Sequence, residues 1–190
     1  MDAQIIRYSN ADTGEDLALL QIRKKNFVSK DVSVKFYLDK DVPPIGTELY
    51  HVGSLLGQMG ANSLTSGLIS QQGRVLSNGK VFGQSSAFAF PGSSGGLLSI
   101  KDDVRIVGVL VRGAGEGFNL FVGTPRVHSW AKKVGVDFAV DDSVSVPSDS
   151  DLQKFPIEDG EFSGSGSKVD AAAVKSQKFL LRLPEVSEKE

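Results

Sequence analysis

The apolar positions of residues 1 to about 140 form short runs, and turn sequences rich in glycine, proline, asparagine and aspartate separate them. These runs predict strands at Ile5–Tyr8, Leu17–Ile22, Val32–Leu38, Glu48–Gly53, Leu64–Gln71, Lys80–Gln84, Leu97–Ile100, Val104–Val111 and Asn119–Val122. Asn78-Gly79 predicts a two-residue hairpin turn, because both residues tolerate a positive φ. Short, regularly spaced strands of this kind indicate an antiparallel barrel or sandwich, so the predicted class is all-β.

One helix is predicted after the last strand. Thr124 can cap it, Pro125 suits its first turn, and Gly135 suits its end. Apolar residues recur at spacings of three and four and form a stripe that can pack on a barrel: Val127, Trp130, Ala131 and Val134.

The composition changes after residue 140, which divides the chain into three parts. Residues 1–140 form the predicted folded domain. Residues 141–168 are rich in Ser, Asp and Gly and are expected to be a flexible linker. Residues 169–190 form a tail with a possible short helix from Asp170 to Pro184.

Charge and residue content exclude several kinds of function. The formal net charge of the 190 residues is -2, which argues against a nucleic-acid partner because phosphate contacts need clustered Lys and Arg. No cysteine is present, and the two histidines lie far apart in the sequence, so no metal or other cofactor is expected. No long apolar run predicts a membrane span, and the sequence leaves the localisation open.

The segment Gly92-Ser93-Ser94-Gly95-Gly96 carries the candidate chemistry. A serine hydroxyl becomes a useful nucleophile on a tight turn whose backbone N–H groups stabilise a developing oxyanion, and flanking glycines permit such a turn. Two other segments accompany it: Asp16-Leu17-Ala18-Leu19-Leu20 places an acid before a strand, and Ser66-Gly67-Leu68-Ile69-Ser70 follows later.

These three segments, in this order and followed by the predicted helix, resemble trypsin-like serine peptidases of the chymotrypsin fold, and the HtrA/Deg-type branch most closely. The resemblance extends from about Ile5 to Gly135. It implies a double β-barrel whose first barrel is incomplete, with a C-terminal helix and a flexible tail. It also implies a serine endopeptidase that acts on peptide or protein substrates.

The resemblance assigns roles to individual residues. Ser94 is the implied nucleophile, Asp16 is the implied triad acid, and the backbone N–H groups of Gly92 and Ser94 are the implied oxyanion hole. Phe88 lies six positions before the nucleophile, where the family lines the floor of its specificity pocket, so an apolar side chain is favoured at the cleavage position. The implied pocket wall consists of Leu110, Val111 and Arg112.

The general base of this family is a histidine that precedes the acid, and none of the fifteen residues before Asp16 is histidine. We therefore expect an N-terminal part with this histidine to be missing from the chain. His51 reads as barrel wall far from the cleft, and His128 lies on the predicted helix behind the barrel. An incomplete barrel has unpaired strand edges, so we also expect a complementing N-terminal segment or a homo-oligomer.

Two functions other than a peptidase stay open. The first is a non-catalytic module that binds extended peptides on a peptidase fold, and such a module needs no base. A structural role in a virion or other assembly is a third reading, and it rests on the linker and tail alone.

Overall fold

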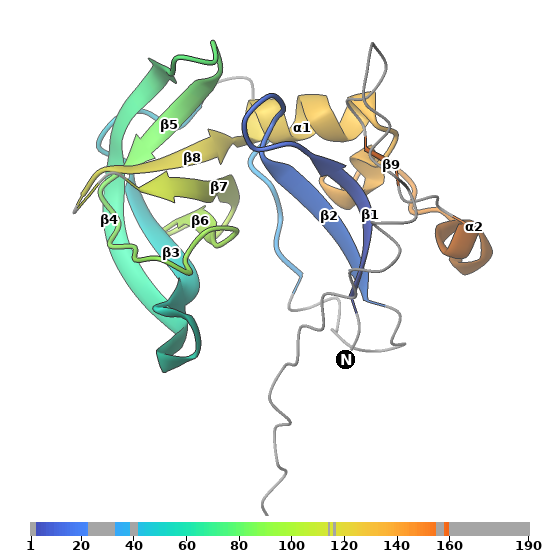
Figure 1. The fold of residues 1–190 in the computed structure, drawn as a ribbon, viewed down its shortest axis with the longest axis horizontal. Coiled ribbons are helices and arrows are strands. Elements are labelled where there is room, and N and C mark those ends of the chain that lie inside the picture. Colours follow the sequence, from blue (N-terminus) through green and yellow to red (C-terminus); the bar gives the residue numbers. More distant parts are fainter. Residues whose placement is uncertain are drawn as a thin grey trace, which may run out of the picture.

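Six antiparallel strands close into a barrel in the computed structural model, which describes residues 3–22, 33–38, 42–113, 115, 117–154 and 158–159. The barrel order is β3-β4-β5-β8-β7-β6 (Figure 1), with bounds β3 (Glu48–Leu55), β4 (Gly60–Val75), β5 (Val81–Ser85), β6 (Leu97–Ile100), β7 (Ile106–Gly113) and β8 (Asn119–Gly123). A short 3-10 turn, η2 (Gly57–Met59), joins β3 to β4.

Apolar residues fill the barrel interior, and buried and outward-facing positions alternate along strands such as β4. The first four residues of β8 are all buried, because Leu120 and Val122 pack in the cluster with α1 on the other face. Burying each such side chain completely contributes about 1.5–3 kcal/mol. The inner cluster consists of Leu49, Ile69, Ala87, Leu98, Val107, Leu110 and Phe121.

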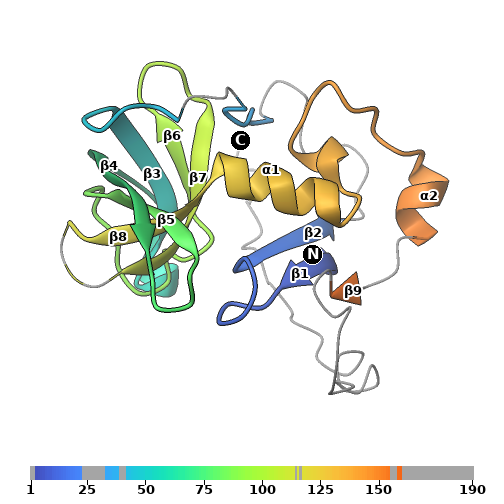
Figure 2. The same ribbon diagram turned by 90° about the horizontal axis from the view of Figure 1, so that it is seen from above.

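A three-stranded sheet lies beside the barrel, in the order β2-β1-β9. Its strands are β1 (Ala3–Ser9), β2 (Leu17–Ile22) and the short β9 (Glu158–Asp159), which pairs with β1 in parallel. Figure 2 shows α1 (Thr124–Lys133) running from the barrel across this sheet. A second core cluster joins β2, the barrel and α1: Leu17, Phe82, Leu120, Val122, Val127, Trp130, Ala131 and Val136.

Helix α1 begins one residue earlier than its sequence signals indicate, because Gly123 occupies the capping position in an extended conformation and Thr124 is already helical. Pro125 lies in the first turn, as predicted. The helix ends where Gly135 takes a φ of +71°, and the N–H of Val136 donates to the carbonyl of Ala131 at 2.8 Å. This is a Schellman ending, for which glycine is the favoured residue.

The strand predicted at Val32–Leu38 is wrong for its described part, residues 33–38, which holds only one parallel bridge, from Phe36 to Ile106. The reason is the lack of a free strand edge. Strand β8 pairs with β7 from Gly108 onwards, so little more than Ile106 is open to residues 33–38.

The hairpin predicted at Asn78-Gly79 joins β4 to β5, but its turn has three residues rather than two. The N–H of Leu76 donates to the carbonyl of Lys80 at 3.1 Å, which leaves Ser77, Asn78 and Gly79 in the turn. Gly79 supplies the positive φ of 75°. The side chain of Asn78 accepts the N–H of Lys80 at 3.1 Å and stabilises the turn.

The all-β class is confirmed. In the described residues it takes the form of one closed barrel, with the three-stranded sheet in the place of the incomplete first barrel. Within the predicted linker 141–168, the structure describes helix α2 (Asp149–Lys154) and β9. The predicted tail 169–190, including its helix, lies outside the described residues. Of the helices that are described, none has the length and apolar character to cross a membrane.

Candidate active site

Backbone hydrogen bonds from Ser93, Gly95 and Gly96 hold the serine turn between β5 and β6. The N–H of Ser93 donates to Phe90, and the N–H of Gly96 donates to the carbonyl of Ser93, both at 2.9 Å. The N–H of Gly95 donates to Leu110 of β7 at 2.7 Å. Ser93 is buried, and Ser94 is exposed at the apex of the turn.

Gly92 has to be glycine in this turn for two reasons. Its φ is +99°, a conformation that side chains other than hydrogen disfavour. A Cβ atom at this position would also lie 2.5 Å from the carbonyl oxygen of Ser54, at the end of β3. The turn is therefore packed directly against the barrel.

Two backbone donors of the turn have no acceptor within the described ranges. Among the described residues, nothing accepts a hydrogen bond from the N–H of Gly92 or from that of Ser94, whereas the N–H groups of Ser93, Gly95 and Gly96 are all bonded. Unpaired, exposed N–H groups on either side of a serine can stabilise negative charge that develops on a carbonyl oxygen.

The hydroxyl of Ser94 donates to the carbonyl of Val111 on β7 at 3.2 Å. This contact holds the side chain at the edge of β7, beside the mouth of a pocket. A backbone carbonyl cannot take up the hydroxyl proton, so this hydrogen bond orients Ser94 without activating it.

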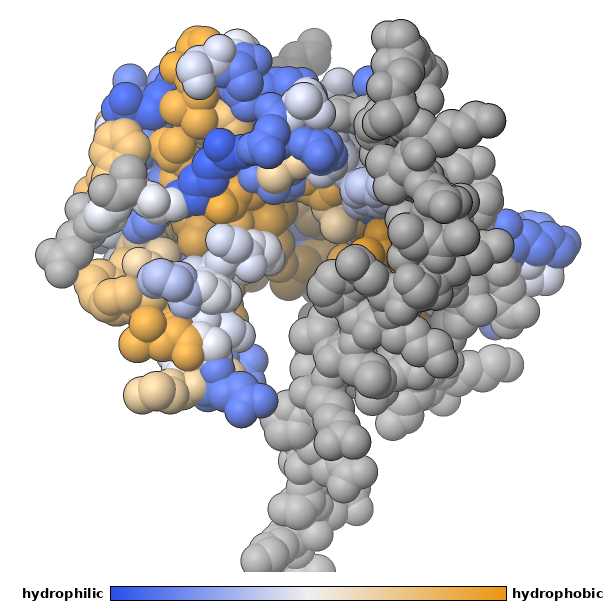
Figure 3. Space-filling model, viewed as in Figure 1, coloured by the Kyte–Doolittle hydropathy of each residue, from blue (hydrophilic) through white to orange (hydrophobic). Residues whose placement is uncertain are grey.

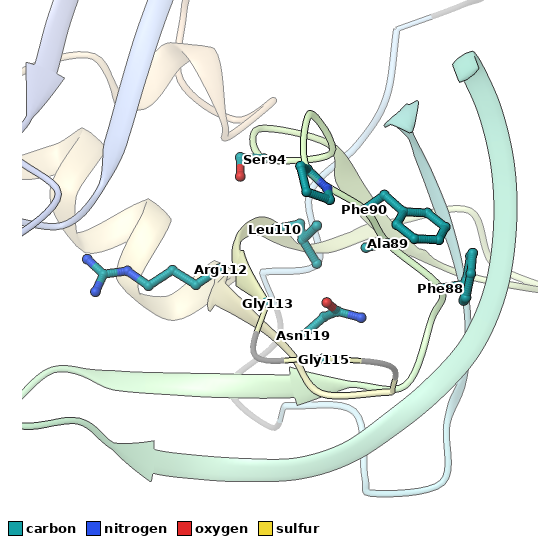
Figure 4. Close-up of a pocket in the computed structure, with 10 residues that line it drawn as sticks. Phe88, Ala89, Phe90, Ser94, Leu110, Arg112, Gly113, Gly115 and Asn119 are labelled. Atoms are coloured by element: carbon teal, nitrogen blue, oxygen red, sulfur yellow. The ribbon is translucent and has the colours of Figure 1, made fainter. Parts of the chain in front are cut away.

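The pocket beside Ser94 has a volume of about 400 Å³ (Figure 4). Phe88 and Phe90 meet edge to face, with their ring centroids 4.6 Å apart. On the side of the barrel seen in Figure 3, apolar side chains line a hollow. The residues around the pocket are Phe88, Ala89, Phe90, Pro91, Ser94, Leu110, Arg112, Gly113, Gly115 and Asn119.

The structure thus brings Phe88, Leu110 and Arg112 together with Ser94. Val111 lies differently from the expected pocket wall. Because side chains alternate along β7, its side chain packs against the cluster beneath α1, and only its carbonyl reaches the site. Asn119, which the sequence analysis did not single out, is a pocket residue.

Asp16 lies in the β1–β2 turn, and its partner is a guanidinium group. Its Oδ2 atom is 3.6 Å from Nε of Arg112, and Nη2 of the same guanidinium donates to the carbonyl of Ala11 at 2.5 Å. The φ of Asp16 is +58°, a conformation that Asp tolerates better than most residues. Arg112 points away from the other side chains that line the pocket (Figure 4), and its contact with Asp16 links the pocket to the acid.

Glu15 fixes this turn to the barrel. Its carboxylate lies 2.5 Å from Nζ of Lys80 and 2.5 Å from a guanidinium nitrogen of Arg126, and it is 20% exposed. Burial alone would raise the pKa of Glu15, but the hydrogen bonds from Lys80 and Arg126 outweigh it and hold the pKa below the ordinary value. Sequence reasoning missed this network because its partners are 65 and 111 positions away.

His51 lies deeper and nearer the serine turn than its sequence position suggested. It is completely buried inside the barrel, and its Nδ1 atom is 3.3 Å from the hydroxyl of Thr65, which donates to the carbonyl of Phe88 at 2.7 Å. A Cβ atom on Gly96 would lie 2.5 Å from Nε2 of His51. Burial lowers the pKa of His51, against the opposing effect of the nearby carbonyls of Ser93 and Phe88. The imidazole thus packs behind the turn, and the hydroxyl of Ser94 bonds elsewhere.

His128 is on α1, where its Nε2 atom lies 3.6 Å from the carboxylate of Asp141. In the described part of the chain, no three His, Asp or Glu side chains come together in a way that could hold a metal ion.

Comparison with known proteins gives one family. Residues 1–109 match the sequence model of the trypsin-like peptidase domain. No curated protein is significantly similar to this sequence.

Solved structures share the fold. The serine endoprotease from Yersinia pestis is 24% identical, with a TM-score of 0.56 over 69% of this chain and 43% of that chain. The S227A variant of the HtrA-type protease AlgW with a tripeptide is 24% identical, with a TM-score of 0.57 over 70% of this chain and 43% of that chain. AlgW with a decapeptide is 20% identical, with a TM-score of 0.57 over 73% of this chain and 41% of that chain. The chain thus spans less than half the length of these proteins.

Proposed function

The chain belongs to the trypsin-like peptidase domain family, and we propose that it hydrolyses peptide bonds through Ser94. In this proposal the Oγ atom of Ser94 attacks the carbonyl carbon of the substrate while its proton passes to a base. The amine then leaves with a proton from that base, and water hydrolyses the acyl-enzyme.

The observation that carries this proposal is the pair of unbonded N–H groups, on Gly92 and Ser94, beside an exposed serine at the mouth of a pocket. The tetrahedral oxyanion would accept hydrogen bonds from both groups. One such donor contributes about 2.7–4 kcal/mol to stabilising the transition state.

Asp16 supports the base in this proposal. A carboxylate next to an imidazole fixes its tautomer and stabilises it when it becomes charged. Because Arg112 now occupies the side of Asp16 that faces the barrel, an arriving imidazole has to displace the guanidinium or approach from its far side. The two histidines of the sequence, His51 and His128, have other surroundings, so we propose that this imidazole comes from a complementing segment or a second copy of the chain.

The substrate backbone would pair with β7. Strand β6 pairs with β7 as far as Val109, and the serine turn bonds to Leu110. Beyond Leu110 no backbone of the described residues pairs with this edge of β7, where the carbonyl of Val111 accepts only the hydroxyl of Ser94. An extended peptide can add to such an edge as a further strand, with one side chain in the pocket. The peptides present in the AlgW structures support this class of ligand.

A second function is favoured by one specific observation. Both residues that would need an imidazole already have other partners: Ser94 bonds to the carbonyl of Val111, and Asp16 pairs with Arg112. This arrangement suits a module that binds extended peptides without cleaving them.

Labelling with a fluorophosphonate probe tests the proposal, with Ser94→Ala as the control. A peptidase site labels at Ser94, and the control does not. A folded protein that binds peptides but never labels would support the binding module instead.

A further inference from the structure

Among the described residues that line the pocket, Asn119 is the only carboxamide, and it is almost completely buried at the start of β8. It pairs with Ser85 on one side and with Gly113 on the other, so its backbone is held from both neighbouring strands. A buried carboxamide normally has hydrogen-bond partners for both its oxygen and its nitrogen.

The side-chain amide of Asn119 has one hydrogen-bond partner in the described part of the chain, and that partner sets its orientation. Nδ2 donates to the carbonyl of Ala87 at 2.8 Å. A carbonyl can only accept, so the nitrogen must face Ala87 and the oxygen must face the opposite way. Figure 4 shows the oxygen on the side of Gly113 and Leu110, inside the ring of lining residues.

The oxygen of Asn119 accepts no hydrogen bond from the described residues. It stays uncovered because the residue beside it is glycine. A Cβ atom on Gly113 would lie 2.8 Å from Oδ1 of Asn119, well inside van der Waals contact. The φ of Gly113 lies outside the left-handed region, so its backbone conformation does not require glycine. A methyl group at this position would fill the space in front of Oδ1 of Asn119.

The surroundings of this oxygen decide which ligand groups suit it. The walls are mostly apolar, and Arg112, the one charged residue among the described lining, directs its guanidinium to Asp16. None of the described residues that line the pocket is a carboxylate, so against them a Lys or Arg side chain would lose its hydration without gaining a counter-charge. A carboxylate ligand has only hydrogen-bond acceptors, so it could not form a hydrogen bond with the oxygen of Asn119.

We propose that Asn119 determines specificity by accepting a hydrogen bond at Oδ1 from a neutral side chain that ends in an O–H or N–H donor, such as tyrosine or threonine. This inference rests on the proposed binding of peptides in the pocket. It refines the purely apolar preference that Phe88 alone implies, because the walls favour an apolar stem and the oxygen favours a donor at its tip.

Binding of matched peptides to the Ser94→Ala protein tests this inference without any turnover. The probes are acetyl-trialanyl peptide amides that end in tyrosine or phenylalanine, and in threonine or valine, titrated by NMR chemical-shift changes. One neutral hydrogen bond predicts a preference of roughly threefold to tenfold for the donor-bearing peptide of each pair.

Two variants locate the effect. Asn119→Leu removes the acceptor, and Gly113→Ala covers it while leaving Asn119 in place, which guards against a folding failure of the first variant. Both are expected to reduce the preference to about onefold, because affinity for the donor-bearing peptides falls more than affinity for their apolar partners.

Equal affinity within both pairs, or a preference that survives in Gly113→Ala, would overturn the role of Asn119 and leave the proposed peptide binding intact. If no peptide shifts any pocket resonance, the proposed function fails, and this inference falls with it.

Discussion

Replacing Glu15 by glutamine should destabilise the protein by about 2 kcal/mol. A surface ion pair contributes about 0–1 kcal/mol, and breaking a buried pair costs about 3–5 kcal/mol. The side chains of Glu15, Lys80 and Arg126 are 19–29% exposed, so their pairing lies between these limits. The change leaves two cations facing each other without a carboxylate between them.

The assay is thermal unfolding of the whole chain at pH 7. A loss of about 2 kcal/mol corresponds to a fall in Tm of roughly 4–8 °C for a protein of this size. Glu48→Gln is the matched control, because Glu48 pairs with Lys101 on the open surface, with side chains 62% and 40% exposed. The control should leave Tm unchanged.

The pH dependence gives a second, sharper test of the same network. The folded-state pKa of Glu15 lies below the ordinary value of 4.5, so the unfolded chain binds the proton more readily. The stabilisation is therefore present above about pH 4.5 and is lost as the pH falls through the folded-state pKa. The Tm values of wild type and Glu15→Gln should converge in that range. Equal Tm values at pH 7, or a difference that persists unchanged to pH 3, would refute this reasoning.

Two further changes test the packing around the serine turn. Gly92→Ala should lower the free energy of unfolding, measured in urea, by about 1–3 kcal/mol, because it adds a steric contact with Ser54 to an unfavourable φ. Gly79→Ala is the control, since Gly79 has a φ of 75° with open space around it, and it should lower the free energy of unfolding less. Equal losses in the two variants would contradict the packing argument. Burial lowers the pKa of His51, so the folded protein holds this imidazole in its neutral form while the unfolded chain binds the proton more readily. Wild type should therefore lose stability as the pH falls below about 6.5. His51→Gln should lose little over the same range, and parallel pH profiles of the two proteins would show that His51 does not titrate as described.

The sequence predicts the barrel strands well because each has at least one face in the core, so apolar residues gather in short runs between turn sequences. The helix is predicted for a similar reason, since Pro125, Gly135 and the apolar stripe all act locally. The segment 33–38 shows the limit of this logic. A strand pattern produces a strand only where a neighbouring edge is free, and the sequence does not show which edges are taken.

The candidate site was predictable where glycine and serine act through the local backbone, as in the turn from Gly92 to Gly96. Its surroundings were not, because they depend on contacts between distant segments. Asn119 reads as an ordinary first residue of a strand, and only its pairing with Gly113 and its bond to Ala87 place its oxygen in the pocket. Likewise, no local pattern reveals that Arg112 reaches across to Asp16.

The imidazole dependence of fluorophosphonate labelling at Ser94 tests the central claim most directly. If the site holds a serine, two N–H donors and an acid ready for a base, adding free imidazole should accelerate labelling of Ser94, mapped by peptide mass spectrometry. Asp16→Asn should reduce this acceleration, and Ser94→Ala should abolish labelling. A folded protein in which imidazole produces no labelling at Ser94, or produces it equally well in Asp16→Asn, would contradict the assignment of these residues to a peptidase site.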